Sequence, residues 1–528
     1  MTFFKYAIAG SIAISISACS ISEPPVLPAK DQQVKTQPNI IFIFSDDLSY
    51  RDLSAYGQTN FSTPHLDQLS SQSVRFSQAY AGAPECAPSR GTLLTGMSVD
   101  KQPIRLNSSA RGFEVLPDNL YTFPKMLQQA GYITGVVGKW GLGYIDTTGN
   151  PLKQGFDYHY GYLTHYEAHS YFPLRLYENN EIIEFQANDD FDLYTLYGQD
   201  RRKKEQQFED YYDDEGKLIK VDLTQATYAP DLFDRKAIEF IEHNKAQPFL
   251  LYFASNLPHG PTITDDFRQL KDRHDMSTYA REWGAMVQRL DISVGRIIET
   301  LKDNNLYDNS LIVFASDNGY SMHTPSQLED GTRVWLEDEF LQNKGQLRGG
   351  KFGVLEAGMR IPMFMKLPNQ EKAQVISQPV WLPDLFPTFA DIASQPLAQK
   401  VEGYSLLPLI DSKPNAIPNQ RPMYFYKNNE QAVRMGPWYA FRPHPNTPIQ
   451  LYLIEDDAML QADVAALYPS VIAQVKHIFN SHEPSEWFWN PGDTAADFKR
   501  KVQRAADEGQ FIKKYYPNHI ELMPWEKK

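Results

Sequence analysis

The segment Asn39-Ile40-Ile41-Phe42-Ile43-Phe44, followed at once by Ser45-Asp46-Asp47, decides the fold that we predict for this chain. A short, continuous apolar run is typical of a β-strand buried on both faces, as in a parallel sheet covered by helices. Three further segments have the same character and also lead into polar residues: Tyr132–Val137, Pro248–Ala254 and Ser310–Ala315. Together the four segments predict the central strands of one sheet.

Helical patterns lie between these strands. Apolar side chains recur at helical spacing over Leu120–Ala130, which Gly131 closes, and over Tyr279–Asn304. Strands that alternate with helices predict an α/β fold, in which a large, mostly parallel sheet is sandwiched by helices. The 528 residues suffice for one large domain with a smaller companion.

Polar residues follow the predicted strands at the same end of the sheet. In such sheets, ligands bind beyond the carboxyl ends of the strands. That position is occupied by Asp46, Asp47, Lys139, His259, Asp317 and Asn318. We therefore expect these six side chains to form one site.

Beyond about Gln420 the pattern changes. Short runs typical of an antiparallel sheet cover Met423–Tyr426, Ala432–Met435, Trp438–Arg442 and Gln450–Ile454, and a helical stretch covers Asp463–Asn480. We predict a main domain over residues 39–420 and a smaller C-terminal α+β subdomain, with its tail, over residues 421–528.

The first 38 residues predict export. Lys5 precedes an apolar stretch, Ala7–Ala18, of signal-peptide length, and Ile16-Ser17-Ala18-Cys19 resembles a bacterial lipobox. We expect a signal peptide over residues 1–18, a lipidated Cys19 and a flexible tether over residues 19–38. The protein would then lie in the periplasm or at the outer membrane, attached to the membrane only through its lipid anchor. An ordinary cleaved signal is the alternative.

Net charge and cysteine content limit the classes of function that this chain can have. The formal net charge of -14 argues against a nucleic-acid-binding protein, because such proteins carry a basic surface. The chain has only two cysteines. If Cys19 carries lipid, Cys86 has no disulfide partner in an oxidising compartment. It is then either buried and inert or kept for chemistry.

The neighbours of Cys86 decide between these two interpretations. The run Cys86-Ala87-Pro88-Ser89-Arg90-Gly91-Thr92-Leu93-Leu94-Thr95-Gly96 resembles the signature of the type I, formylglycine-dependent sulfatases of the alkaline phosphatase-like superfamily. The resemblance covers most of residues 39 to about 482, including Leu347-Arg348-Gly349-Gly350-Lys351 and Glu356-Ala357-Gly358-Met359-Arg360-Ile361-Pro362. It implies an alkaline phosphatase-like fold and sulfate ester hydrolysis by a catalytic domain over residues 39–420. Exported bacterial polysaccharide sulfatases and arylsulfatases are the members that it resembles.

The resemblance also implies that Cys86 is oxidised to formylglycine, by a formylglycine-generating enzyme or an anaerobic sulfatase-maturating enzyme. The hydrated aldehyde carries two hydroxyls on one carbon. One attacks sulfur, and the other expels sulfate and restores the aldehyde. A serine would lack the second hydroxyl. A divalent cation would lower the pKa of the attacking hydroxyl and polarise the sulfate oxygens.

Four residues offer the oxygen atoms that Ca²⁺ and Mg²⁺ prefer over softer donors: Asp46, Asp47, Asp317 and Asn318. The resemblance implies that these four residues, together with residue 86, are calcium ligands. The alternative is that the first pair caps a helix and that the second pair forms a turn with Gly319.

Basic residues complete the predicted active site. Lys139 and Lys351 resemble the family's two sulfate-holding lysines, and Arg90 resembles the arginine that orients formylglycine. His259 matches a family histidine that, with Lys351, protonates the departing oxygen. General acid catalysis of this kind contributes about 10²–10⁴-fold. The alternative for the lysines is a solvated surface position.

One position departs from the family pattern. The family commonly has a histidine two residues after the first lysine, where it is a candidate base for the elimination step, and this chain has Gly141. We hypothesise that His165 or His169 substitutes for it. Substrate binding and simple packing are the alternatives for both histidines. Arg348, just before the Gly-Gly-Lys turn, is a third candidate for substrate binding.

The substrate that we expect is a sulfated poly- or oligosaccharide. Export, a surface anchor and an aromatic content of 13% favour it, because sugar rings stack on aromatic faces while Arg and His bind sulfates. The segment Tyr171–Thr227, rich in Tyr, Asp and Arg, could rim the cleft. Two alternatives are a phosphonate or phosphate ester hydrolase of the same superfamily and an inactive, glycan-binding surface lipoprotein.

Overall fold

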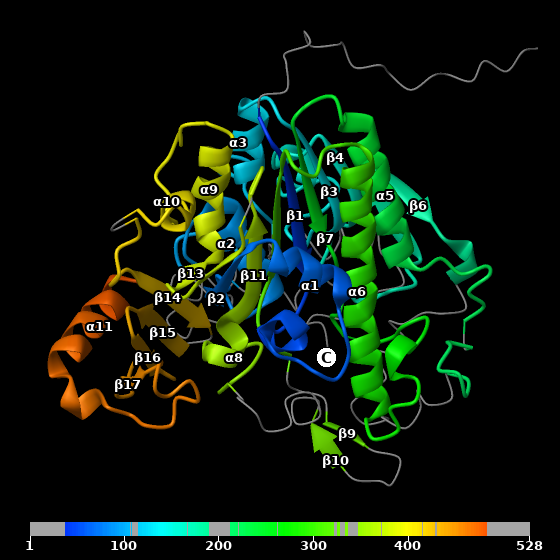
Figure 1. Cartoon of the computed structure of the whole chain (residues 1–528). Helices are drawn as coiled ribbons and strands as arrows, with labels where there is room; N and C mark the ends of the chain where they lie inside the picture. Colours follow the sequence, from blue (N-terminus) through cyan, green and yellow to red (C-terminus); the bar gives the residue numbers. More distant parts are fainter. Residues whose placement is uncertain are drawn as a thin grey trace, which may run out of the picture. The chain divides into compact units, whose positions relative to one another are not determined.

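The computed structural model describes residues 37–482, apart from 106, 108–114, 166, 189–211, 220, 261, 322–324, 328–332, 336–346, 371, 414–415 and 428–429. Its main element is a sheet with the strand order β12-β2-β11-β8-β1-β7-β3-β4-β5-β6, with β13 beside β2 (Figure 1). The strands are β1 Asn39–Ser45, β2 Val74–Tyr80, β3 Ile133–Lys139, β4 Tyr158–Tyr162, β5 Arg175–Glu178, β6 Glu181–Glu184, β7 Phe249–Ala254, β8 Ser310–Ser316, β11 Arg360–Lys366, β12 Gln374–Ile376 and β13 Val380–Trp381.

The centre of the sheet is parallel. Strands β8, β1, β7, β3 and β4 pair in that order and run in one direction. This confirms the predicted parallel core, with β1 in the middle of it. Antiparallel strands flank the core: β11 pairs with β8 and β2 on one side, and β5 and β6 extend the other edge.

Helices cover both faces of the sheet, as predicted. The longer helices are α1 Pro64–Ser71, α2 Cys86–Thr95, α3 Phe123–Gln129, α5 Ala229–Asn244, α6 Thr278–Asp303, α9 Leu385–Ile392 and α11 Pro469–Ser481, and the short ones are α8 Glu356–Met359 and α10 Leu407–Ile410. Figure 1 shows α2, α3 and α9 on one side of the sheet and α1, α5 and α6 on the other.

Strand β1 joins two hydrophobic cores because its side chains alternate between the faces. Ile40, Phe42 and Phe44 belong to the core beneath α3 and α9, whereas Ile41 and Ile43 belong to the core beneath α5 and α6. All five side chains are fully buried. The apolar run Asn39–Phe44 is therefore continuous because helices bury both of its faces.

A separate antiparallel sheet follows the main one, and this confirms the predicted C-terminal arrangement. Its order is β14-β15-β16-β17, with bounds Pro422–Lys427, Glu430–Met435, Trp438–Arg442 and Gln450–Leu453. A two-stranded sheet is formed by β9 Pro325–Gln327 and β10 Arg333–Trp335. A buried ion pair between Lys427 of β14 and Glu85 connects the C-terminal sheet to the residue before Cys86.

Two helix predictions were wrong at their starts. The helix predicted over Asp463–Asn480 is a single 3-10 turn, Ala465–Leu467, followed by α11 from Pro469. The helix predicted from Leu120 begins at Phe123. In both cases a proline lies in the first turn, where its missing N–H costs no hydrogen bond and its fixed φ favours a helix start.

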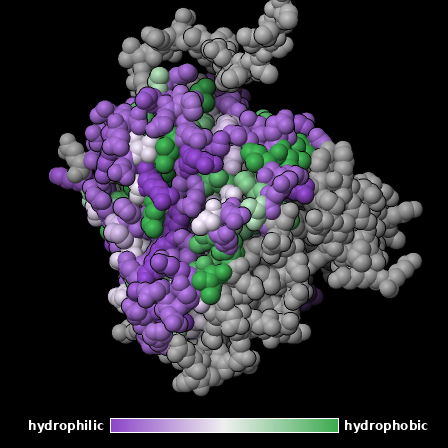
Figure 2. Space-filling model, turned by 90° about the vertical axis from the view of Figure 1, so that its right-hand side faces the viewer, coloured by the Kyte–Doolittle hydropathy of each residue, from purple (hydrophilic) through white to green (hydrophobic). Residues whose placement is uncertain are grey.

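On the face shown in Figure 2, the described residues are mostly hydrophilic, and the hydrophobic ones lie in separate small groups. None of the helices in the described ranges is both long and apolar enough to cross a membrane. The predicted signal peptide and Cys19 lie outside the described residues, as does the tail after residue 482. The domain boundary at residues 420/421 stays a prediction.

Gly138 lets β3 deliver Lys139 to the end of the sheet, and its replacement is our first test. Gly138 has φ +113, and an added Cβ would lie 2.1 Å from the backbone oxygen of Ala254 in β7. We expect Gly138→Ala to lower the free energy of unfolding by about 2–5 kcal/mol, the sum of backbone strain and overpacking. Gly131→Ala is the matched control, since its φ is +88 but nothing lies within 4 Å. Gly131→Ala should lower the free energy of unfolding only by the backbone strain, about 1–2 kcal/mol. If urea unfolding shows the same loss of free energy of unfolding for Gly138→Ala and Gly131→Ala, this account of β3 is contradicted.

Candidate active site

The carboxyl ends of the central strands bring the predicted polar residues together. Asp46 and Asp47 follow β1, Asp317 and Asn318 follow β8, and Lys139 is the last residue of β3. These positions are adjacent because β1 pairs with β8 in exact register up to Ser45 and Ser316. All five side chains are buried.

Asp47 turns the chain sharply at the end of β1. Its φ of 64° lies in the left-handed region, which Asp tolerates better than most residues. The turn lets the Asp47 N–H donate to Oδ1 of Asp317 over 3.1 Å, and the Asp46 N–H donates to the carbonyl of Leu257 over 3.1 Å. The ends of β1, β7 and β8 are thereby tied to one another.

Cys86 enters the site from helix α2, of which it is the first residue. The amino end of a helix carries partial positive charge, which favours an anion there. Arg90 lies one turn further along the same helix. Its guanidinium donates to Oδ2 of Asp317 through Nε at 3.1 Å and Nη2 at 2.9 Å, and through Nη1 to the carbonyl of Lys139 at 2.6 Å. Arg90 therefore positions the ends of β3 and β8 around residue 86.

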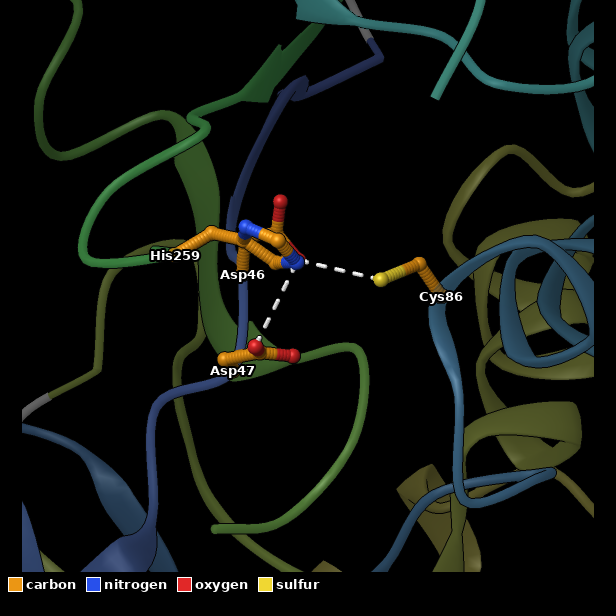
Figure 3. Close-up of side chains that lie close together, drawn as sticks. All are labelled: Asp46, Asp47, Cys86 and His259. Carbon is orange, nitrogen blue, oxygen red and sulfur yellow. Dashed lines mark hydrogen bonds and ion pairs between the residues drawn. The ribbon is translucent and has the colours of Figure 1, made fainter. Parts of the chain in front are cut away.

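Charged side chains meet around Cys86, and Figure 3 shows Asp46, Asp47 and His259 close to it. Sγ of Cys86 lies 3.3 Å from Oδ1 of Asp46 and 3.5 Å from Nζ of Lys351. Lys139 pairs with Oδ2 of Asp46 at 2.6 Å, and Lys351 pairs with Oδ1 of Asp47 at 2.7 Å. The thiol therefore sits between two aspartate–lysine pairs.

Burial and the neighbouring charges shift the pKa values of this cluster. Burial raises the pKa of the Cys86 thiol, and the adjacent Asp46 carboxylate adds to the rise. Burial also opposes ionisation of Asp46, but Lys139 and the other cations outweigh it and hold that pKa well below its usual range. Burial and the nearby Asp46 raise the pKa of Asp317. An unmodified thiol in this position is a poor nucleophile, because only the thiolate attacks.

His259 and Lys351 form a pair suited to proton transfer. Nζ of Lys351 lies 2.9 Å from Nε2 of His259, while Nδ1 of His259 contacts the carbonyl of Gly260. A neutral imidazole with its hydrogen on Nδ1 satisfies both contacts. Burial and the charge of Lys351 lower the pKa of His259 to about 4, which agrees with this neutral form.

The donor atoms of the cluster could hold a metal ion. Asp46, Asp47, Cys86 and His259 each offer one ligand atom, and these atoms lie within 4.8 Å of one another. Asn318 adds a carbonyl oxygen, Oδ1, which is buried and accepts no hydrogen bond, although its Nδ2 donates to Asp47 over 2.8 Å. A buried oxygen without a donor is costly unless something else binds it. The cluster could therefore hold a metal ion, with carboxylate and amide oxygens as its main ligands.

The two candidate histidines take different places. A Cβ added to Gly141 would lie 3.4 Å from Cβ of His165, so His165 lies directly beside the glycine. The ring of His169 instead stacks on that of His259, with centroids 4.3 Å apart and planes 7° apart. Burial and the charge of Lys139 lower the pKa of His165 to about 3, so its imidazole is neutral at neutral pH.

Arg348 contacts the C-terminal part of the described chain. It is exposed, and its Nη1 donates to the hydroxyl of Tyr452 and to the carbonyl of Leu460, each over 3.0 Å. These contacts tie the Gly-Gly-Lys turn to the C-terminal sheet. The substrate-binding role predicted for Arg348 stays a prediction.

Sequence reasoning missed a tyrosine that supports the site. The hydroxyl of Tyr171 contacts the carbonyls of Asn256 and His259, each over 2.7 Å, and so holds the loop that carries His259. Tyr171 was placed at the start of a segment expected to rim the cleft. The described part of that segment instead contains β5 and β6, while residues 189–211 lie outside the described residues. No local pattern marks a buried tyrosine as the partner of a distant loop.

Comparison with known proteins identifies the family. A model of the family "Sulfatase" matches residues 38–395, more than half of the chain. The chain belongs to the sulfatase family. It is a sulfate ester hydrolase, as the sequence predicted, and its fold is that of the alkaline phosphatase-like superfamily.

The sulfatase is similar to proteins from animals and from bacteria. It is 27% identical to an N-acetylgalactosamine-6-O-sulfatase of Bacteroides thetaiotaomicron, over 85% of this chain and 94% of the relative. It is 30% identical to arylsulfatase H of Homo sapiens, over 71% of this chain and 73% of the relative. The solved structure of Ps i-CgsB superimposes with a TM-score of 0.68 at 28% identity, covering 89% of this chain and 99% of that chain, and another structure shows Ps i-CgsB with k-i-k-neocarrahexaose.

Calcium binding tests the assignment of Asn318. We expect added CaCl₂ to raise the thermal unfolding midpoint of the sulfatase, because a ligand that binds only the folded state stabilises it. Asn318→Ala removes one buried oxygen and should raise the apparent Kd for Ca²⁺ about tenfold or more. Asn39→Ala is the matched control, since Asn39 is a buried asparagine at the opposite end of β1. A calcium-dependent shift that is the same in wild type and Asn318→Ala would contradict the assignment.

Proposed function

We propose that this sulfatase removes sulfate from a sulfated poly- or oligosaccharide, using formylglycine formed from Cys86 and a calcium ion. The observation that carries the proposal is the arrangement around Cys86. A residue at the amino end of a buried helix faces two lysines for the sulfate and a lysine–histidine pair for the leaving oxygen. The relatives that act on N-acetylgalactosamine 6-sulfate and the structure with bound neocarrahexaose support a carbohydrate substrate.

Asp46, Asp47, Asp317 and Asn318, with residue 86, would hold the calcium ion, which would polarise the sulfate oxygens. The formylglycine hydrate would supply two hydroxyls on one carbon, one to attack sulfur and one to expel sulfate. Burial and the adjacent Asp46 raise the pKa of the unmodified Cys86 thiol, so the cysteine itself is a poor nucleophile and the proposal assigns the attack to the hydrate. A formylglycine-generating or anaerobic sulfatase-maturating enzyme would be the required partner.

The side chains of this chain supply binding and proton transfer. Lys139 and Lys351 would contact the sulfate oxygens, since each Nζ lies within the cluster around Cys86. The Lys351–His259 pair would donate a proton to the departing sugar oxygen as the S–O bond breaks. Arg90 would keep Asp317 and the end of β3 in place while the charge on the substrate changes.

We propose that the protein works outside the cytosol as a lipoprotein. Its predicted signal sequence and the lipobox-like Ile16-Ser17-Ala18-Cys19 support attachment through Cys19 at the periplasmic side of a membrane or on the outer membrane. A large sulfated polysaccharide is accessible to an enzyme in that position. Labelling with a radioactive fatty acid, with Cys19→Ala as the unlabelled control, would test the anchor.

Matched aryl esters test the reaction class. We expect kcat/KM for p-nitrophenyl sulfate to exceed that for p-nitrophenyl phosphate and phenylphosphonate by about tenfold or more. Lys139 and Lys351 are each already paired with an aspartate, so the second negative charge of the phosphate ester gains little attraction. The phosphonate ester carries one negative charge, like the sulfate ester, and compares sulfur with phosphorus at equal charge. Cys86→Ala should lose about 10³-fold or more on the sulfate ester. Preference for the phosphate or phosphonate ester would favour the alternative hydrolase, and full activity of Cys86→Ala would contradict both readings.

We further propose that His165 takes the place of the histidine missing at Gly141 and serves as the base for sulfate release. Its position beside Gly141 supports this role. In single-turnover experiments, His165→Ala should slow sulfate release by about 10²–10⁴-fold while release of the alcohol stays fast. His169→Ala should instead slow release of the alcohol, because His169 stacks on His259. Unchanged sulfate release in His165→Ala would contradict the substitution.

A further inference from the structure

Phe352, the residue after Lys351, is a large apolar side chain left partly open to solvent. It is 48% exposed, and among the described exposed hydrophobic residues it alone adjoins a member of the charged cluster in sequence. It belongs to none of the hydrophobic clusters formed by the described residues. Packing of the core therefore does not explain its side chain.

The backbone of Phe352 is strained. Its φ of 71° lies in the left-handed region, and Phe352 is the only aromatic residue with a positive φ in the described part of the chain. A residue with a bulky side chain adopts this conformation at an energetic cost, and such outliers concentrate at functional sites. Gly350 and Gly353 lie on either side of Lys351 and Phe352, so the chain has glycine nearby but not at the strained position.

Hydrogen bonds on both sides hold this conformation. The Phe352 N–H donates to the carbonyl of Pro84 over 2.8 Å, and the Lys351 N–H donates to the carbonyl of Tyr320 over 2.6 Å. After Phe352, the N–H of Val354 donates to Oε2 of Glu430 over 3.2 Å. The turn is thereby fixed between the segment before Cys86 and the C-terminal sheet.

The ring of Phe352 lies beside two lysines, one of which belongs to the charged cluster. Its centroid is 5.3 Å from Nζ of Lys351 and 5.8 Å from Nζ of Lys427. Nζ of Lys351 is in turn 3.5 Å from Sγ of Cys86 and 2.9 Å from Nε2 of His259. The ring therefore adjoins the lysine assigned to the departing oxygen, and the alcohol part of the substrate must lie on that side.

We propose that Phe352 is the stacking platform for the sugar ring that carries the sulfate, an inference that rests on the proposed function. A pyranose has an apolar face of C–H groups, and covering an exposed aromatic ring with it removes apolar surface from water. The two ammonium groups fix the orientation of the ring. Phe352 is thus a substrate-binding residue for the carbohydrate, separate from the groups that hold the sulfate.

The test compares Phe352→Gly and Phe352→Tyr with wild-type enzyme that carries formylglycine. The probes are oligosaccharides of N-acetylgalactosamine 6-sulfate and of carrageenan, and the best wild-type substrate among them is used for all variants. We expect Phe352→Gly to lower kcat/KM about three- to tenfold, mainly through KM, because it loses an aromatic contact. Phe352→Tyr keeps the ring and should stay near wild type. Tyr404→Ala, which removes an exposed aromatic residue elsewhere, should also leave kcat/KM unchanged.

Two readouts separate stacking from a structural role. Phe352→Gly relieves the strained φ, so its thermal unfolding midpoint should equal or exceed that of wild type, whereas a structural role predicts a lower midpoint. The inhibition constant of inorganic sulfate should not change, because sulfate contacts the lysines and not the ring. If the wild-type enzyme hydrolyses an oligosaccharide and Phe352→Gly hydrolyses it with the same kcat/KM, the stacking proposal alone is overturned. Absence of wild-type turnover on every sulfated oligosaccharide would overturn the proposed carbohydrate function, and the stacking proposal with it.

Discussion

Three carboxylates and three cations share one buried site at the end of the parallel sheet, and the structure depends on their mutual compensation. Asp46 pairs with Lys139, Asp47 with Lys351, and Asp317 with Arg90. Burial of any one of these charges alone would be strongly unfavourable, whereas each pair offsets much of the desolvation cost. The pairs come from elements far apart in sequence, so the charge balance is reached only when β1, β3, β8 and α2 are all in place.

The same balance explains how a strongly acidic protein can bind an anionic substrate. The site is close to neutral before any ligand arrives, because the aspartates and the basic residues are equal in number. A divalent cation on the carboxylate and amide oxygens would make the site positive. The amino end of α2 adds partial positive charge to it. The net charge of -14 therefore lies elsewhere on the molecule and does not set the field at Cys86.

Much of the fold and the composition of the site could be predicted from sequence. The run Asn39–Phe44 is uniformly apolar because both faces of β1 are buried, and the residues that follow such strands must meet at one edge of the sheet. The relation of His165 to Gly141 could not be predicted, because it depends on how the loop after β4 folds over the end of β3. Tyr171 and Phe352 were missed for a similar reason. One acts through a hydrogen bond to a distant loop, and the other is marked only by its backbone angle and its exposure.

The central claim is that Cys86 is the precursor of the nucleophile, and the mass of one peptide tests it most directly. Trypsin releases residue 86 in the peptide from Phe76 to Arg90. In protein produced together with a formylglycine-generating enzyme, we expect this peptide to have the mass of an aldehyde at residue 86 and to react with a hydrazide reagent. A peptide that keeps the mass of an unmodified cysteine under these conditions, in protein that still hydrolyses sulfate esters, would contradict the account.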